Sequence, residues 1–197
     1  MRKIAVISII TILYGCGTIT PGHDTTQTSN WKIHQASIFS HNRWQAVAKM
    51  SVQSPQYSGS VRLDWKQLDE NFSIILAGPL GLQNILMTGD SDEAVIHYKG
   101  KRKVGSPNLL IKEIIGIPLQ ISALAYWLRG IPSPNLIQTN LLIHPEGQAH
   151  KFEQAGWSLE FDKYKPTPFG SMPKKILGSN KERSFKLIIS QWSKIKI

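Results

Sequence analysis

The sequence has one cysteine, Cys16, among its 197 residues, so no disulfide can form within the chain. Acidic side chains are also scarce: 13 aspartates and glutamates stand against 23 lysines and arginines, which gives a formal net charge of +10. A balance of this sign attracts anionic lipid surfaces and acidic proteins. Beyond the first 13 residues, no apolar run approaches the roughly 20 residues that a transmembrane helix needs. We therefore expect the body of the protein to be soluble.

The motifs of catalysis and metal binding are missing as well. There is no Gly-x-Ser-x-Gly nucleophile elbow and no His-Glu-x-x-His motif, and no two of the six histidines are four residues apart. The acidic residues fall mostly in expected turns or on solvated strand faces. We therefore expect no catalytic residue, no metal site and no cofactor, and we interpret the protein as a non-enzyme.

What is present at the amino terminus is an export signal over residues 1–15. Arg2 and Lys3 precede an almost wholly apolar stretch, residues 4–13. Ten helical residues span only about 15 Å, half of the roughly 30 Å of a bilayer's hydrocarbon core, so this segment is too short to be a stable membrane span. Export makes a nucleic acid partner unexpected.

Cys16 lies directly after this apolar segment. The stretch Leu13-Tyr14-Gly15-Cys16 resembles the bacterial lipobox, in which the cysteine thiol receives a diacylglyceryl group and the chain is cleaved before the cysteine. The resemblance implies that Cys16 is lipidated, and Gly17 in place of an aspartate implies passage to the outer membrane. An ordinary signal peptide with an incidental cysteine remains the alternative.

Residues 16–30 are rich in Thr, Ser, Gly, Pro and Gln and show no apolar periodicity, which is typical of a flexible tether. We expect them to join the lipidated cysteine to one domain over residues 31–197. A short helix is expected at the start of that domain, over residues 29–41.

The following segments alternate apolar and polar residues, which predicts half-buried antiparallel strands. Expected strands cover residues 44–52, 57–66, 72–77, 82–87, 94–98, 136–143, 147–154, 157–164 and 185–192, with turn signals that include Gly147, Gly156 and the triplet 178–180.

Between residues 107 and 129 the apolar period becomes helical, with a break at Gly116-Ile117-Pro118. Such an insert between short alternating strands must cover a face or a mouth of the sheet. The sequence therefore predicts a mainly β protein with some α structure: an open, incomplete antiparallel β-barrel of about 8–11 strands, with a helical lid enclosing a hydrophobic cavity.

One long segment carries a family resemblance. Residues 114–132, IIGIPLQISALAYWLRGIP, resemble the most recognisable segment of the LolB family of outer-membrane lipoprotein receptors. Further segments agree in order and spacing: GSVRLDWKQ at 59–67, LAGPLG at 76–81, GWSLEFDKY at 156–164 and MPKKI at 172–176.

The resemblance implies an open barrel whose cavity holds the acyl chains of a lipoprotein, received from the periplasmic carrier LolA and inserted into the outer membrane. Within this frame, apolar periodicity selects the candidate cavity and lid residues Leu63, Trp65, Ile74, Leu76, Leu110, Ile114, Leu124, Trp127 and Leu128.

The same resemblance gives a role to Leu80. Pro79 and Gly81 favour a tight turn around it, and the family carries an exposed leucine at this place that is needed to release cargo into the membrane. The expected partners are thus lipoprotein acyl chains, LolA and outer-membrane lipid, and we expect a monomer facing the periplasm. An assembly or scaffold lipoprotein, solidly packed and binding a protein partner through this loop, is the alternative.

Overall fold

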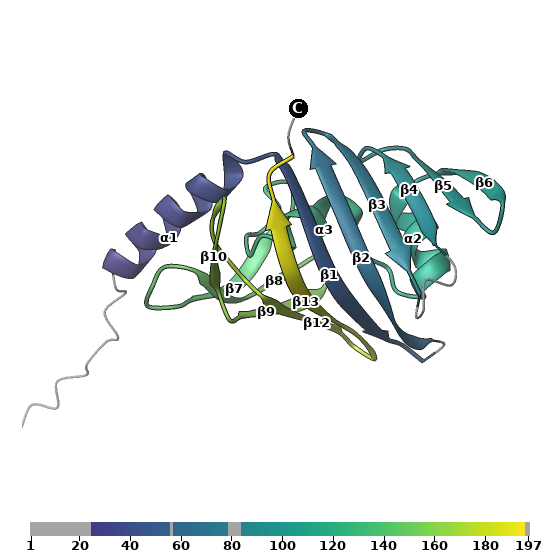
Figure 1. Cartoon of the computed structure of the whole chain (residues 1–197). Helices are drawn as coiled ribbons and strands as arrows, with labels where there is room; N and C mark the ends of the chain where they lie inside the picture. The colour runs from purple at the N-terminus through teal and green to yellow at the C-terminus, as the bar shows by residue number, and fades with distance from the viewer. Residues whose placement is uncertain (1–24, 56, 79–83, 196–197) are drawn as a thin grey trace, which may run out of the picture.

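The protein is described from a computed structural model, which covers residues 25–55, 57–78 and 84–195. Its centre is an antiparallel sheet of eleven strands in the order β6-β5-β4-β3-β2-β1-β13-β12-β9-β8-β7 (Figure 1). These strands are β1 (Arg43–Gln53), β2 (Ser58–Leu68), β3 (Asn71–Ala77), β4 (Ile85–Gly89), β5 (Ala94–Tyr98), β6 (Lys101–Gly105), β7 (Gln138–Ile143), β8 (Ala149–Gln154), β9 (Trp157–Asp162), β12 (Lys175–Asn180) and β13 (Arg183–Ser193).

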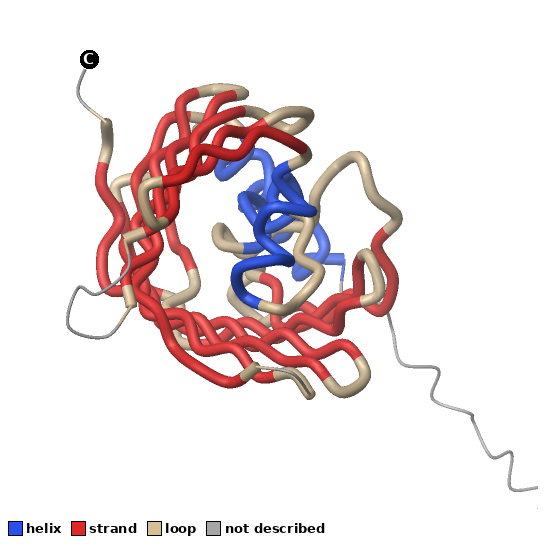
Figure 2. Tube along the Cα trace, turned by 90° about the vertical axis from the view of Figure 1, so that its right-hand side faces the viewer, coloured by secondary structure: helices blue, strands red, loops and turns tan. Residues whose placement is uncertain are grey.

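The sheet curls without closing, because β6 and β7 are its two edges and do not pair with each other. Figure 2 shows the strands wrapped around the helices of residues 107–127, which lie inside the curl. This confirms the predicted open antiparallel barrel with helices on its inner side. A separate two-stranded ribbon is formed by β10 (Lys165–Thr167) and β11 (Gly170–Met172).

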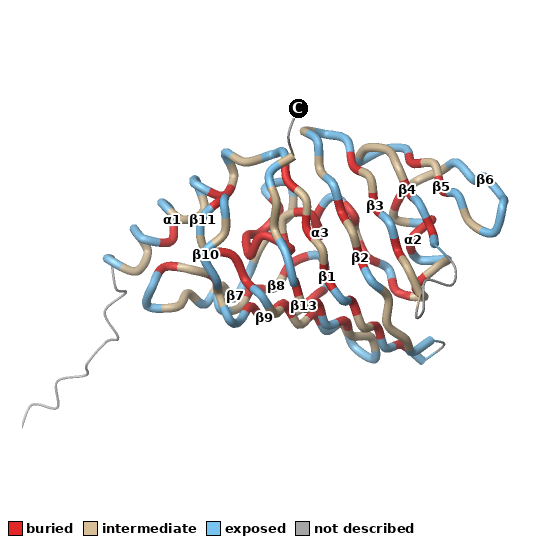
Figure 3. Tube along the Cα trace, viewed as in Figure 1, coloured by how far each residue is buried: buried red, intermediate tan, exposed pale blue. Residues whose placement is uncertain are grey.

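The apolar and polar residues that alternate in the sequence lie on opposite faces of the sheet. Along β1, the residues from Trp44 to Val52 are buried at every second position, and β1 pairs with β2 over its whole length. The last strand, β13, lies on the other side of β1. Figure 3 shows buried positions recurring along these central strands and in the helices that face them.

Two strands of the main sheet were not predicted. Strand β6 reads KRKVG and is largely exposed, so it carries no apolar alternation. In β12, Gly178-Ser179-Asn180 was interpreted as a turn, and this was wrong: the turn follows at residues 181–182. Glycine is needed within this strand because a Cβ at position 178 would overlap the ring of Phe185.

The helical insert consists of α2 (Pro107–Ile115) and α3 (Ile121–Trp127). The predicted break is confirmed, since Gly116 caps α2 in the left-handed conformation with φ 73°. The first helix, α1 (Thr25–Phe39), begins earlier than expected, so residues 25–30, which the composition assigned to the tether, are helical. No helix in the described ranges is long and apolar enough to cross a bilayer.

Candidate functional site

The nine predicted cavity and lid residues are brought together on the concave side of the sheet. Their side chains belong to a single hydrophobic cluster, in which Ile114 is half-buried and the other eight are at most 3 % exposed. The set comes from β2 (Leu63, Trp65), β3 (Ile74, Leu76), α2 (Leu110, Ile114), α3 (Leu124, Trp127) and the residue after it (Leu128).

A pocket of about 240 Å³ opens where the helices leave the concave face uncovered. The sheet contributes Trp44, Trp65 and Phe72 to its wall, and α3 contributes Ile121 and Ala125. Trp65 is the one predicted cavity residue among the residues that line it. The ring centroids of Trp44 and Trp65 lie 5.9 Å apart, so two large apolar surfaces meet at the entrance.

A buried cation lies beside this pocket. Arg129, 6 % exposed, donates from Nη1 to His41 O at 2.8 Å and from Nε to Ala125 O at 3.1 Å. Its guanidinium also lies over the Tyr126 ring, 4.8 Å from the centroid. Burial lowers the pKa of Arg129 to about 10, so it stays protonated at neutral pH. Arg129 thereby ties the end of α3 to the segment after α1.

A glutamine holds α3 from the other half of the sheet. Gln154 in β8, 2 % exposed, accepts hydrogen bonds from Trp127 Nε1 at 2.8 Å and from the backbone N–H of Ser133 at 2.9 Å. Its own amide donates to Ser133 O and Leu136 O. The sequence did not predict this role for Gln154, because a polar residue at the end of a strand is common. Arg129 lies in the segment that resembles the family, but no separate role was predicted for it.

A second opening on the concave side lies between α2 and strands β5 and β6, with a volume of about 410 Å³. Leu110 and Ile114 line it, as part of the predicted set, together with Ile96 and Tyr98, which sequence reasoning had placed on a strand without a functional role. Three lysines stand at its rim: Lys99, Lys101 and Lys103.

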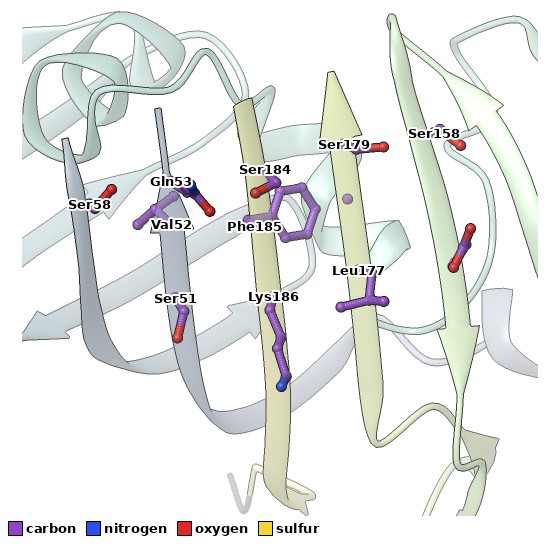
Figure 4. Close-up of a pocket in the computed structure, with 12 residues that line it drawn as sticks. Ser51, Val52, Gln53, Ser58, Ser158, Leu177, Ser179, Ser184, Phe185 and Lys186 are labelled. Carbon is purple, nitrogen blue, oxygen red and sulfur yellow. The ribbon is translucent and has the colours of Figure 1, made fainter. Parts of the chain in front are cut away.

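The outer face of the sheet is hollowed too, over about 710 Å³, but with different chemistry (Figure 4). Its wall combines apolar side chains, such as Val52, Leu177 and Phe185, with hydroxyl, amide and charged groups, and no predicted site residue lines it. The predicted site residues that line an opening, Trp65, Leu110 and Ile114, do so on the concave side of the sheet. Within the described ranges, no three His, Cys, Asp or Glu side chains are grouped so that they could hold a metal ion.

Two predicted elements lie outside the described residues: Cys16 with the export signal, and the turn of Pro79, Leu80 and Gly81. Strand β3 ends at Ala77 and β4 begins at Ile85, so the segment between them joins two neighbouring antiparallel strands.

Comparison with known proteins gives one family. The sequence model described as outer membrane lipoprotein LolB matches residues 42–192. The chain is 29 % identical to the outer-membrane lipoprotein LolB of Ectopseudomonas mendocina, over 98 % of this chain and 96 % of that protein. It is 30 % identical to the LolB of Cellvibrio japonicus, over 97 % of each chain.

Solved structures share the fold at low sequence identity. A LolA superfamily protein from Nitrosomonas europaea aligns with a TM-score of 0.54 and 9 % identity, covering 86 % of this chain and 93 % of that one. A putative outer membrane lipoprotein-sorting protein domain from Vibrio parahaemolyticus aligns with a TM-score of 0.52 and 13 % identity, covering 85 % and 91 %.

Proposed function

The chain belongs to the LolB family of outer-membrane lipoproteins, and from this premise we propose how its concave face carries out the receptor function. The resemblance seen in the sequence is thereby confirmed. The protein is a non-enzymatic receptor that accepts lipoproteins from LolA and anchors them in the outer membrane. Its chemistry is transfer of acyl chains between apolar environments.

The observation that carries the proposal is the continuity of apolar contact behind the tryptophan-lined pocket. Trp44, Trp65 and Phe72 form the entrance, and the predicted cavity residues continue inward from it as one cluster. The entrance is mixed in character, since Asp69, Glu70 and Arg129 also line it, but an acyl chain that passes inward between α3 and strands β1 to β3 meets aliphatic and aromatic surface. We assign this region as the cargo site.

The present pocket of about 240 Å³ falls below the roughly 300–1,000 Å³ of typical ligand sites, and three acyl chains need more space than this. Cargo must therefore displace α2 and α3 from the sheet. The two helices are joined by the hydrogen bond from Ile121 N to Asn108 Oδ1 at 2.8 Å, so they can move together. The apolar contacts that the helices give up are replaced by contacts with the acyl chains.

This exchange explains why transfer needs no external energy source. Each methylene group taken from water contributes about 0.8 kcal/mol, so a long acyl chain is held by more than ten kcal/mol in any apolar site. A chain that passes from carrier to concave face to bilayer keeps equivalent contacts at each stage. The direction follows from relative affinities along the path.

The anchor and the membrane contact complete the proposal. Lipid on Cys16 holds the protein at the outer membrane, and Leu80, flanked by Pro79 and Gly81, enters the acyl layer at the end of the β3–β4 hairpin when cargo is released. A tight turn generally leaves a leucine exposed to water, whereas a membrane provides apolar surroundings for it.

A photo-crosslinker placed on each face of β3 tests the cargo site. Phe72→p-benzoylphenylalanine puts the reactive group at the pocket, and Ile75→p-benzoylphenylalanine puts it on the outer face, where Ile75 is 39 % exposed. With a lipoprotein delivered by LolA, position 72 should crosslink to its acyl chains and position 75 should not. Equal crosslinking at both positions would contradict the assignment and favour a scaffold that binds cargo elsewhere.

A further inference from the structure

The opening between α2 and the β5–β6 hairpin differs in chemistry from the tryptophan-lined pocket. Its floor is apolar, made by Ile96 and Tyr98 from the sheet and by Leu110 and Ile114 from α2. Its volume of about 410 Å³ lies within the range of roughly 300–1,000 Å³ typical of ligand sites. Lysines rather than aromatic residues stand at its rim, so it suits an amphiphile with an apolar chain and an anionic head.

The register of the sheet explains why lysines face this groove. Lys101 lies opposite Tyr98 and Lys103 lies opposite Ile96, so both lysines project from the inner face of β6. Arg102 and Val104 alternate with them and project from the outer face. The cations at the groove and the cation outside it are thus neighbours along one strand.

Only part of the positive charge at the groove is neutralised. Lys103 Nζ is 2.5 Å from Glu113 Oε2, which ties β6 to α2. In the described part of the chain, neither Lys99 nor Lys101 has a carboxylate within salt-bridge distance; Lys99 Nζ lies 5.1 Å from the centroid of the Tyr98 ring. Two cations therefore remain available for an anion.

The turns of the sheet give this groove an orientation. Lys99 lies in the β5–β6 turn, at the end of the sheet where β3 stops and β4 begins. The turns at the opposite end carry carboxylates: β2–β3 holds Glu70 and Asp69, the latter paired with Arg43, and β4–β5 holds Asp90, Asp92 and Glu93. An anionic membrane surface therefore attracts the end with the groove and repels the other end.

We propose that this groove binds one anionic phospholipid of the target membrane, with an acyl chain between α2 and β5 and the phosphate against Lys99 and Lys101. The inference rests on the proposed function only in placing the protein at a membrane. The proposed phospholipid differs from the cargo, because the triacylated cysteine of a lipoprotein carries no phosphate and its amino group is acylated to an amide. Binding of such a lipid orients the β3–β4 hairpin toward the bilayer.

Lysines that point inward on an edge strand also prevent pairing with a strand of another molecule. That role accounts for Lys101 and Lys103 but not for the apolar floor beside them. The two explanations separate experimentally, because one concerns lipid affinity and the other concerns self-association.

The test is a titration of the full chain carrying Cys16→Ala, which removes the covalent lipid, with monomeric dihexanoylphosphatidylglycerol, followed through the amide NMR signals of β5, β6 and α2. We expect saturable shifts around Ile96 and Ile114. Lys101→Gln should weaken binding roughly tenfold, since a hydrogen bond to a charged group is lost, while the matched variant Arg102→Gln on the outer face should change it less than about twofold. Dihexanoylphosphatidylcholine, whose head group has no net charge, and glycerophosphoglycerol, which has no chains, should both bind much more weakly.

Equal losses of lipid affinity in Lys101→Gln and Arg102→Gln would show only a general attraction of the lipid to a basic surface, and would contradict the proposed site. Unchanged lipid affinity in Lys101→Gln, with new dimers in sedimentation, would assign the lysines to edge protection and overturn it as well. Acceptance of a lipoprotein from LolA is measured separately on the same proteins. If acceptance is normal but the groove binds no lipid, only this inference fails; if acceptance fails but the titration succeeds, the proposed function fails.

Discussion

Trp127 Nε1 donates a hydrogen bond to Gln154 Oε1 at 2.8 Å, and this contact joins the end of α3 to β8 on the far half of the sheet. Both residues are almost fully buried. At the carboxyl end of α3 the lid is attached by polar contacts, to β8 through Gln154 and to the segment after α1 through Arg129; apart from the Lys103–Glu113 ion pair between β6 and α2, its side chains pack against the sheet in one hydrophobic cluster. Attachment of this kind lets apolar contacts be exchanged for acyl chains without release of the helix.

Gln154→Leu should destabilise the protein by roughly 3 kcal/mol. The substitution leaves the Trp127 indole N–H, the Ser133 N–H and the Leu136 carbonyl without their partner, whereas Ser133 O keeps a hydrogen bond from Leu136 N at 3.4 Å. Each of the three unsatisfied groups costs about 1 kcal/mol or more. Urea unfolding measures the change. The control is Gln148→Leu, since half-buried Gln148 makes one long hydrogen bond, to Ser171 Oγ at 3.4 Å, and should lose less than about 1 kcal/mol. Equal losses in the two variants would contradict the anchoring role.

The free energy of unfolding should depend on pH through His34 in α1. Burial lowers the pKa of this imidazole below its usual 6.5, and its Nε2 has no hydrogen-bond partner among the described residues. The unfolded chain then binds the proton more readily than the folded chain, so stability falls as the pH drops through about 6.5 toward the folded-state pKa. His34→Gln should show a smaller fall between about pH 7.5 and about pH 5.5. An unchanged pH dependence in urea unfolding would contradict this origin.

Cys16→Ala should abolish membrane anchoring and leave the receptor domain able to accept cargo. The reason is that the predicted lipid is attached outside the fold, ahead of α1. Fractionation of cells should show the variant lost from the outer membrane, and purified variant should still take a lipoprotein from LolA. Loss of folding in this variant would contradict the tether interpretation.

The sequence predicted those parts of the fold in which side-chain pattern and backbone geometry coincide. Trp44 to Val52 alternate because β1 has one buried face, and Gly116 with Pro118 breaks the helical insert where the chain must turn. Strand β6 escaped prediction because an exposed edge strand places lysines where an inner strand has apolar residues. Gly178 resembles a turn residue in the sequence. The feature that requires a glycine there, the ring of Phe185, belongs to the neighbouring strand β13 and cannot be recognised from the residues around position 178.

The site was predicted unevenly for a similar reason. Apolar periodicity identified residues that face inward, such as Leu63 and Trp127, and these do gather in one cluster. Whether an inward residue lines a pocket or fills the core depends on how α2 and α3 pack against the strands, and this is not encoded in periodicity. Trp44 and Phe72, which open onto the pocket beside Trp65, were therefore recognised only from the structure.

The central claim is that acyl chains pass through the concave face of this protein into a bilayer, and one transfer measurement tests it most directly. Cys16→Ala protein is mixed with LolA that carries a labelled triacylated lipoprotein, and liposomes are added afterwards. We predict that the label moves first to the protein and then to the liposomes, and that with Leu80→Glu in addition it reaches the protein but stalls there. Label that never leaves LolA would contradict the receptor function, and normal delivery by the Leu80→Glu protein would contradict the role of the β3–β4 turn.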